Sequence, residues 1–357
     1  MRKRSWLAGL VCVLLGACAP VPSAGSSQTA ASATSPPANT VGSQPGSEPA
    51  AVPTPIPLRA AYASVAGAFG PIWLAHELGL FAEQGLAATL VQMDSTQVAQ
   101  ALVAGDLDLA VAGAQSAVEP ALAGADTVLL GSFMWTLEQT LVTLPHITRP
   151  EQLRGAKIGV AGPRGAVAIG VRLQAKALGL DPQRDITLVP LGNPSNNLAA
   201  MASGVIDGAG LSAPATIHAR RAGYYFWDDV PGVASVDFVS TGPISRRAIV
   251  ASQRDALLRA LRALAQATAI QKYDRERSFP VLAKYFQSDD PEALEETFRV
   301  FHARLTPDLR PNPRGLQTVL EYADHPAARD ARVDQFVDLS LLDELEREGF
   351  FATLPQG

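Results

Sequence analysis

The chain contains very little cysteine, with two residues in 357. Cys12 and Cys18 both lie near the N-terminus. The rest of the chain can therefore form no disulfide and no thiolate metal site, and it has no cysteine nucleophile. Histidine is also scarce, and its five positions lack the close spacing of metal ligands: His76, His146, His218, His302 and His325. We expect neither a metal nor another cofactor.

Positive charge is in short supply. Lys and Arg number 29 against 34 Asp and Glu, which gives a net charge of −5. Nucleic-acid-binding domains carry a basic footprint, so this composition predicts that nucleic acid is not a partner. The chain also lacks an apolar run of the about 20 residues that cross a bilayer core. The apolar run at residues 6–15 is too short for that.

The sequence also lacks common enzyme motifs. Gly159, Gly162 and Gly165 follow a predicted strand, but their spacing is G-x-x-G-x-x-G. A dinucleotide-binding loop has G-x-G-x-x-G instead. Ser116 lies in GAQSA, which is not a nucleophile-elbow pattern. We therefore expect a protein that is not an enzyme.

The N-terminus reads as an export signal. Basic residues at positions 2–4 precede the apolar run at 6–15. The next segment, LGAC at 15–18, resembles the lipobox of bacterial lipoproteins, in which the cysteine becomes the lipidated first residue. The resemblance implies a signal peptide over residues 1–17 and a lipid on Cys18. It also implies a location at the cell membrane, facing the extracytoplasmic side. The alternative is an ordinary signal peptide with a chance cysteine.

The segment after Cys18 is predicted to be a disordered tether. Residues 18–57 consist mostly of Ala, Ser, Thr, Gly and Pro, with no Leu and no aromatic residue. Such a composition cannot bury enough apolar surface to offset its chain entropy. Residues 58–357 are more than one compact core usually holds, so we expect two lobes.

An internal repeat is the most informative feature of residues 58–357. Residues 71–93 match 170–191, and residues 100–113 match 198–212. Each copy reads as two helices alternating with strands, which predicts two βαβαβ units with parallel sheets. The glycines are expected to end helices and the aspartates to have a structural role. Four matched pairs fix the alignment: Leu78/Leu178, Thr89/Thr187, Gly105/Gly204 and Asp108/Asp207.

The remainder of the chain is predicted to be helical. Residues 252–273 place leucines on one face, with a cap at Ser252 and Asp255. Residues 289–305 begin with Asp290 before Pro291 at the first helical position. Further helices are expected near 314–323 and 338–348.

These features together resemble the substrate-binding proteins of bacterial ABC importers. Three segments are similar to the nitrate/sulfonate/taurine and thiamine-precursor group: LAHELGLFAEQGLAATLVQ, QALVAGDLDLAVAG and PEQLRGAKIGVAGPRG. The resemblance implies an α/β, two-lobed periplasmic-binding-protein type II fold. Each lobe would be a mainly parallel sheet flanked by helices, and the C-terminal part would be helical.

The resemblance also implies the division of the chain and its partners. Lobe 1 would comprise residues 58–141 plus 241–357, and lobe 2 residues 142–240. The crossings between them would fall near 140–145 and 237–242. The partners would be a small-molecule solute and the permease and ATPase subunits of an ABC importer. The protein would act as a monomer.

The predicted ligand site lies where the parallel strands end. Ligands of open parallel sheets bind at the carboxyl ends of the strands, which selects six loops, at 64–70, 94–97, 113–116, 162–167, 192–197 and 212–216. In these loops Arg164 is the one cation and Asp94 the one anion. The candidate ligand-binding residues, with Trp135 added as an aromatic, are Ser64, Phe69, Asp94, Ser95, Gln115, Ser116, Trp135, Arg164, Asn193, Asn196 and Ser212.

The small, neutral character of these loops favours a larger, mostly neutral heteroaromatic solute. Phe69 or Trp135 would stack on its ring. Riboflavin-binding lipoproteins of this family are the nearest resemblance, and a vitamin precursor fits the same description. Two alternatives stay open. Arg164 could bind a sulfonate, nitrate or another small anion, and the protein could be a tethered sensor that presents its ligand to a receptor.

Overall fold

The structure, a computed structural model, describes residues 54–163, 165–228, 230 and 236–355. The predicted signal peptide, Cys18 and the tether up to residue 53 lie outside the described residues. The first strand, β1 (Ile56–Tyr62), includes the last two residues of the predicted tether, 56 and 57. Residues 56 and 57 therefore pair with a neighbouring strand in the folded unit.

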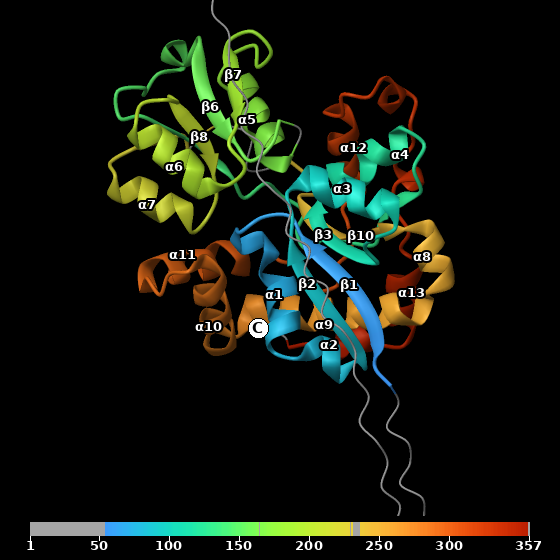
Figure 1. Cartoon of the computed structure of the whole chain (residues 1–357). Helices are drawn as coiled ribbons and strands as arrows, with labels where there is room; N and C mark the ends of the chain where they lie inside the picture. The colour runs from blue at the N-terminus through green and yellow to red at the C-terminus, as the bar shows by residue number, and fades with distance from the viewer. Residues whose placement is uncertain (1–53, 164, 229, 231–235, 356–357) are drawn as a thin grey trace, which may run out of the picture. The chain divides into compact units, whose positions relative to one another are not determined.

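The first sheet is mixed and has the strand order β2-β1-β3-β10-β4 (Figure 1). Strand β1 pairs in parallel with β2 and with β3. Strand β10 joins from much later in the chain and is antiparallel to both β3 and β4. The bounds of these further strands are β2 (Leu86–Gln92), β3 (Leu109–Gly113), β4 (Thr127–Leu129) and β10 (Thr241–Arg246).

The second sheet repeats this arrangement with the order β7-β6-β8-β5-β9. Strand β6 is parallel to β7 and β8, whereas β5 is antiparallel to β8 and β9. The prediction of mainly parallel sheets is therefore correct for the three strands that each copy of the unit contributes. It did not include the antiparallel strand next to them, which is β10 in the first sheet and β5 in the second. The strands are β5 (Thr140–Thr143), β6 (Ala156–Val160), β7 (Ile186–Pro190), β8 (Gly208–Leu211) and β9 (Tyr225–Phe226).

Helices flank the two sheets and form most of the C-terminal part. In the first copy they are α1 (Gly70–Glu77), α2 (Leu80–Glu83), α3 (Ser95–Ala104) and α4 (Gln115–Leu122). In the second copy they are α5 (Ala166–Ala177), α6 (Pro194–Ala202) and α7 (Ala215–Arg221). The C-terminal part has α8 (Arg247–Ser252), α9 (Arg254–Tyr273), α10 (Arg275–Phe286), α11 (Pro291–His302), α12 (Pro313–Glu321) and α13 (Ser340–Arg347). Within the described part of the chain, every helix is too short or too polar to span a bilayer.

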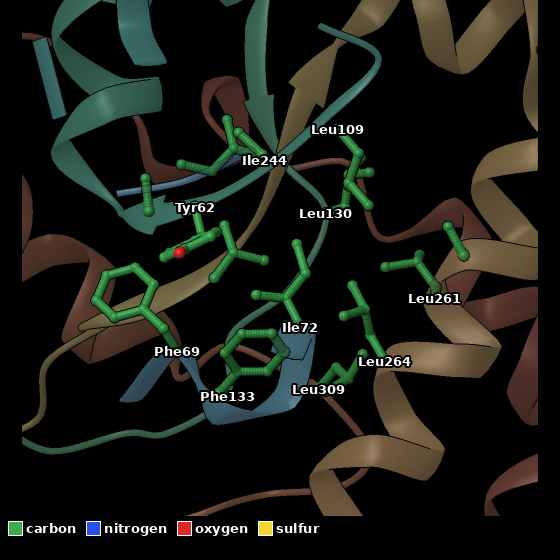
Figure 2. Close-up of a cluster of buried hydrophobic side chains, with 14 of the residues drawn as sticks. Tyr62, Phe69, Ile72, Leu109, Leu130, Phe133, Ile244, Leu261, Leu264 and Leu309 are labelled. Atoms are coloured by element: carbon green, nitrogen blue, oxygen red, sulfur yellow. The ribbon is translucent and has the colours of Figure 1, made fainter. Parts of the chain in front are cut away.

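Helix α9 is central to the larger core. It packs against α1, α10, α11 and α13. Its leucines Leu257, Leu261 and Leu264 are fully buried, as their spacing on one helical face predicts. Figure 2 shows Leu261 and Leu264 in the same buried cluster as Ile72 of α1 and Phe133. The C-terminal helices are thus part of the core that supports the first sheet.

The structure confirms the internal repeat, down to a shared hydrogen-bond pattern. Asp108 accepts a hydrogen bond from the backbone N–H of Arg59 at 2.8 Å, and Asp207 accepts one from the backbone N–H of Lys157 at 2.8 Å. In each copy the carboxylate follows one glycine-ended helix and holds the first strand of the unit. The structural role predicted for the two aspartates is confirmed. The Arg59 side chain also pairs with Asp108 and, against the effect of burial, lowers the pKa of this carboxyl.

The predicted helix ends are partly correct. Gly105 and Gly204 have φ values of 84° and 69°, so both adopt the left-handed conformation expected where a helix stops. Asp290 caps α11 by accepting from the N–H of Glu292. The predicted cap of α9 at Ser252 and Asp255 is wrong, because Ser252 ends the separate helix α8 and α9 begins only at Arg254.

Two crossings connect the sheets, one between β4 and β5 and one between β9 and β10. They run side by side, since Thr136 and Asp237 form an antiparallel bridge and the Phe238 N–H donates to the Trp135 carbonyl at 2.8 Å. The first crossing precedes the predicted 140–145, because residues 140–143 already pair in β5. The exact division into lobes 58–141 plus 241–357 and 142–240 stays a prediction.

Candidate functional site

A cleft of about 550 Å³ lies among the loops that follow the parallel strands of both sheets. Its volume is in the range of small-molecule sites. Each of the six loops selected from the sequence contributes at least one lining residue. The carboxyl ends of the strands therefore meet at one cavity, as the repeat of the unit predicts.

Six of the predicted binding residues line this cleft. They come from the loops after β1, β2, β3 and β8 and are Ser64, Phe69, Ser95, Gln115, Ser116 and Ser212. Phe69, Gln115, Ser116 and Ser212 are buried, so their side chains have fixed surroundings. Their role in ligand binding stays a prediction.

Three polar candidates at the cleft loops cap helices or bind nearby backbone. Asp94 caps α3 and accepts from the N–H groups of Thr96 and Gln97 at 2.8 and 2.9 Å. Asn193 caps α6, and Asn196 donates its side-chain N–H to the Leu191 carbonyl at 2.7 Å. They are not among the lining residues. These local bonds explain why Asp, Asn and a following polar residue occur at the starts of the helices.

The two remaining candidates lie elsewhere. Trp135 is 41% exposed, donates its indole N–H to the Arg310 carbonyl at 2.5 Å, and does not line the cleft. Arg164 lies outside the described residues, although its neighbours Pro163 and Gly165 line the cleft. Whether either residue binds the ligand stays a prediction.

Several buried polar atoms of the cleft have no hydrogen-bond partner among the described residues. They are both side-chain amide atoms of Gln115 and one oxygen each of Gln139 and Asn197. A buried polar group without a partner costs about 1–3 kcal/mol, so such groups usually have an external partner. The cleft thus offers one unused donor group and several unused acceptors to a solute. Sequence reasoning missed Gln139, which lies in a crossing, and Asn197, which is adjacent to the candidate Asn196.

Glu138 is a second group that sequence reasoning missed. It lines the cleft from the first crossing. Its carboxylate accepts from the Ser240 hydroxyl at 3.1 Å and from the Gln139 side-chain N–H at 2.5 Å. Burial raises the pKa of Glu138 to about 7, against the opposing effects of a backbone hydrogen bond, the Ser240 hydroxyl and Arg304. The side chain therefore changes charge near neutral pH. No signal in the sequence marks this residue, because it lies outside the six loops.

The charged residues that line the described part of the cleft are two acids and a histidine. Glu119 belongs to α4, Glu138 to the crossing, and His325 to the C-terminal part. No Lys or Arg lines the cleft among the residues that the structure describes.

An ion-pair cluster connects α7, which belongs to the second copy of the unit, with α11 of the C-terminal part. Arg221 at the end of α7 pairs with Asp290 and Glu292 at the start of α11. Hydrogen bonds from Arg221 to both acids raise the pKa of its guanidinium and lower that of Asp290. Helices α7 and α11 also pack against each other. The ion pairs thus stabilise the contact between α7 and α11.

We predict that Arg221→Gln loosens the contact between α7 and α11. Because the pair is exposed to solvent, the effect should be modest, with amide exchange at the two helices faster by about two- to fivefold. Hydrogen exchange read by mass spectrometry measures it. Arg332→Gln, which breaks the exposed pair with Asp334, is the matched control. Equal exchange at α7 and α11 in both variants would contradict the prediction.

Two repeated α/β sheets, two paired crossings and a cleft between their loops define the periplasmic-binding-protein fold. The structural comparisons agree. The alkanesulfonate-binding protein SsuA of Xanthomonas axonopodis pv. citri bound to MOPS aligns with a TM-score of 0.61 and 20% identity, covering 82% of this chain and 98% of that one. The nitrate-binding protein NrtA of Synechocystis PCC 6803 gives a TM-score of 0.66 and 13% identity, covering 82% and 89%. The predicted fold class is confirmed.

The chain belongs to the NMT1/THI5-like family, which matches residues 67–274. A candidate binding protein of Brucella abortus (strain 2308) is 28% identical over 245 residues, which is 66% of this chain and 73% of that protein. The resemblance drawn from the sequence segments is thereby confirmed at the level of the family.

Proposed function

We propose that this protein is the extracytoplasmic solute-binding component of an ABC importer. It captures a small organic solute in the cleft and delivers it to the permease and ATPase subunits. The observation that supports this role is the cleft between the loops of two sheets, with buried amide groups that lack partners among the described residues. Its role is binding rather than catalysis, so the solute leaves chemically unchanged.

The chemistry of the cleft supports a neutral heteroaromatic solute such as riboflavin or a related vitamin precursor. The Gln115 amide offers a donor and an acceptor side by side, which complements the alternating N–H and C=O groups of a pyrimidinedione ring. Phe69 provides an aromatic face in the same cleft. The carboxylate of Glu119 disfavours an anion.

A second candidate is a small anion such as a sulfonate or nitrate. The structural likeness to SsuA and NrtA favours it. The chain position of Arg164 favours it as well, since both neighbours of this residue line the cleft. A tethered sensor that presents its ligand to a membrane receptor is the remaining alternative, and a pull-down of membrane partners distinguishes it from an importer component.

We predict saturable binding of riboflavin by the purified full chain, measured by quenching of flavin fluorescence. Gln115→Leu removes both unpartnered amide atoms at similar volume. It should weaken binding by about tenfold, since each neutral hydrogen bond contributes about 0.5–1.5 kcal/mol. Gln317→Leu makes the same chemical change on the exposed side of α12 and should bind like the unmodified chain.

The same titration tests the rival ligand class. Nitrate, sulfate and a small sulfonate are expected not to bind and not to compete with riboflavin. Saturable binding of nitrate or a sulfonate without any flavin response would contradict the proposed ligand class while leaving the solute-binding role intact. Arg164→Gln would then be the first variant to examine.

A further inference from the structure

A second cavity of about 300 Å³ lies next to the cleft. Glu138 and Gln139 line both spaces, so these two residues lie between them. Its other lining residues come from the second copy of the unit and from the C-terminal part. They include Thr216 and Arg220 of α7, and Arg304 just after α11. The cavity is therefore enclosed by residues from segments far apart in the sequence.

Three polar atoms of this cavity are buried and have no partner among the described residues. They are the hydroxyls of Thr140 and Thr216 and the side-chain oxygen of Gln139. Thr216 is only 7% exposed to solvent. Other polar groups of the wall are already used, since Gln174 bonds the Leu141 N–H and the Gly170 carbonyl. The two threonine hydroxyls are thus available as donors to a bound molecule.

Three arginines (Arg220, Arg299 and Arg304) and three acids (Glu138, Asp228 and Glu296) line the cavity, and the arginines differ in how they are paired. Arg220 pairs with Asp228 at 2.9 Å, and Arg299 pairs with Glu296 at 2.6 Å. Within the described residues, Arg304 forms no ion pair as close as 4 Å, interacts with the Glu138 carboxyl at longer range, and donates to the Val300 carbonyl at 3.0 Å. Its other N–H groups can therefore bind an acceptor. The nearby Glu138 carboxyl is partly neutral at pH 7, because its pKa is raised to about 7.

We propose that this second cavity binds a small organic carboxylate. Arg304 pairs with the carboxylate, and the hydroxyls of Thr140 and Thr216 donate to its oxygens. Apolar wall residues such as Leu137, Val230 and Val300 leave room for a short carbon skeleton. The volume is at the lower end of small-molecule sites, which excludes a solute the size of a flavin.

The test is isothermal titration of the full chain, purified in detergent, with acetate, lactate, succinate and citrate, and with sulfate as the inorganic comparison. We expect saturable binding of at least one carboxylate. Arg304→Gln should weaken it by about tenfold or more, and Thr216→Val by about three- to tenfold. Trp227 lines the cavity, so the carboxylate should also change a fluorescence signal that Trp227→Phe removes.

Three controls keep the result specific to this cavity. Thermal unfolding without ligand shows whether each variant is folded. Arg332→Gln removes an exposed arginine elsewhere and should bind as tightly as the unmodified chain. Gln115→Leu alters the cleft and should leave carboxylate binding unchanged within about twofold. The proposal is independent of what the cleft binds, so failure of riboflavin binding does not affect it. No carboxylate binding up to millimolar concentration, or binding that is equal in Arg304→Gln, overturns it.

Discussion

Cys18→Ser is expected to move nearly all of the protein from the membrane fraction to the soluble fraction. If Cys18 carries the lipid, as the lipobox resemblance implies, a serine hydroxyl does not replace its thiol, and the polar segment after it is not expected to hold the protein on a bilayer. Each buried CH₂ of an acyl chain contributes about 0.8 kcal/mol, so loss of the chains removes the attachment. Ultracentrifugation of lysed cells, followed by immunoblotting, measures the distribution.

The chain offers a matched control for this prediction. Cys12→Ser changes the other cysteine, inside the apolar run of the signal, and should leave the protein in the membrane fraction. Incorporation of labelled fatty acid should be retained in Cys12→Ser and absent in Cys18→Ser. A Cys18→Ser protein with a cleaved signal that still sediments with membranes would disprove the lipobox interpretation.

Glu138→Gln is expected to change how stability depends on pH. The pKa of Glu138 is about 7 in the folded chain against 4.5 for the ordinary carboxyl. Between these values the folded state binds more protons than the unfolded state, so the free energy of unfolding falls as pH rises from 4.5 to 7. The pKa difference corresponds to at most about 3 kcal/mol. Glutamine does not titrate, so this part of the fall should disappear.

Urea unfolding at pH 4.5, 6, 7 and 8 measures the effect, and the difference between variant and unmodified chain should be largest above pH 7. The groups that face Glu138 are Ser240, Gln139 and Arg304, and the variant keeps all three. Glu119→Gln removes the other carboxylate of the cleft and is the control. Parallel pH profiles for Glu138→Gln and the unmodified chain would show that the carboxyl titrates normally.

Much of the fold could be predicted from the sequence because the same pattern of residues occurs in both copies of the unit. Gly105 and Gly204, like Asp108 and Asp207, occupy equivalent places, and one physical cause explains each pair. A return of the chain to the first lobe at residue 241 was expected from the resemblance, but the strand β10 that joins the first sheet there was not predicted. This strand belongs to neither copy, and its partners β3 and β4 are more than a hundred residues away.

The site was predicted through its loops and missed where side chains reach it from elsewhere. Ser64, Gln115 and Ser212 follow strands and line the cleft as expected. Glu138 and His325 lie in a crossing and in the C-terminal part, where no local pattern places them at the cavity. Polar residues at helix starts were ambiguous from sequence alone, since Asn193 serves equally well as a cap or as a ligand contact.

The paired crossings have a mechanical consequence. Two unconnected crossing segments would let the parts of the molecule that carry the two sheets twist, slide and bend relative to each other. The bridge between Thr136 and Asp237 instead joins the two crossing segments into one ribbon. A hydrogen-bonded ribbon bends across its face far more easily than it shears along its length. For the importer component proposed above, we therefore expect closure around a solute to be a rotation about this ribbon. This predicts that a permease that contacts one point on each side of the ribbon distinguishes the loaded protein from the empty one by a single distance.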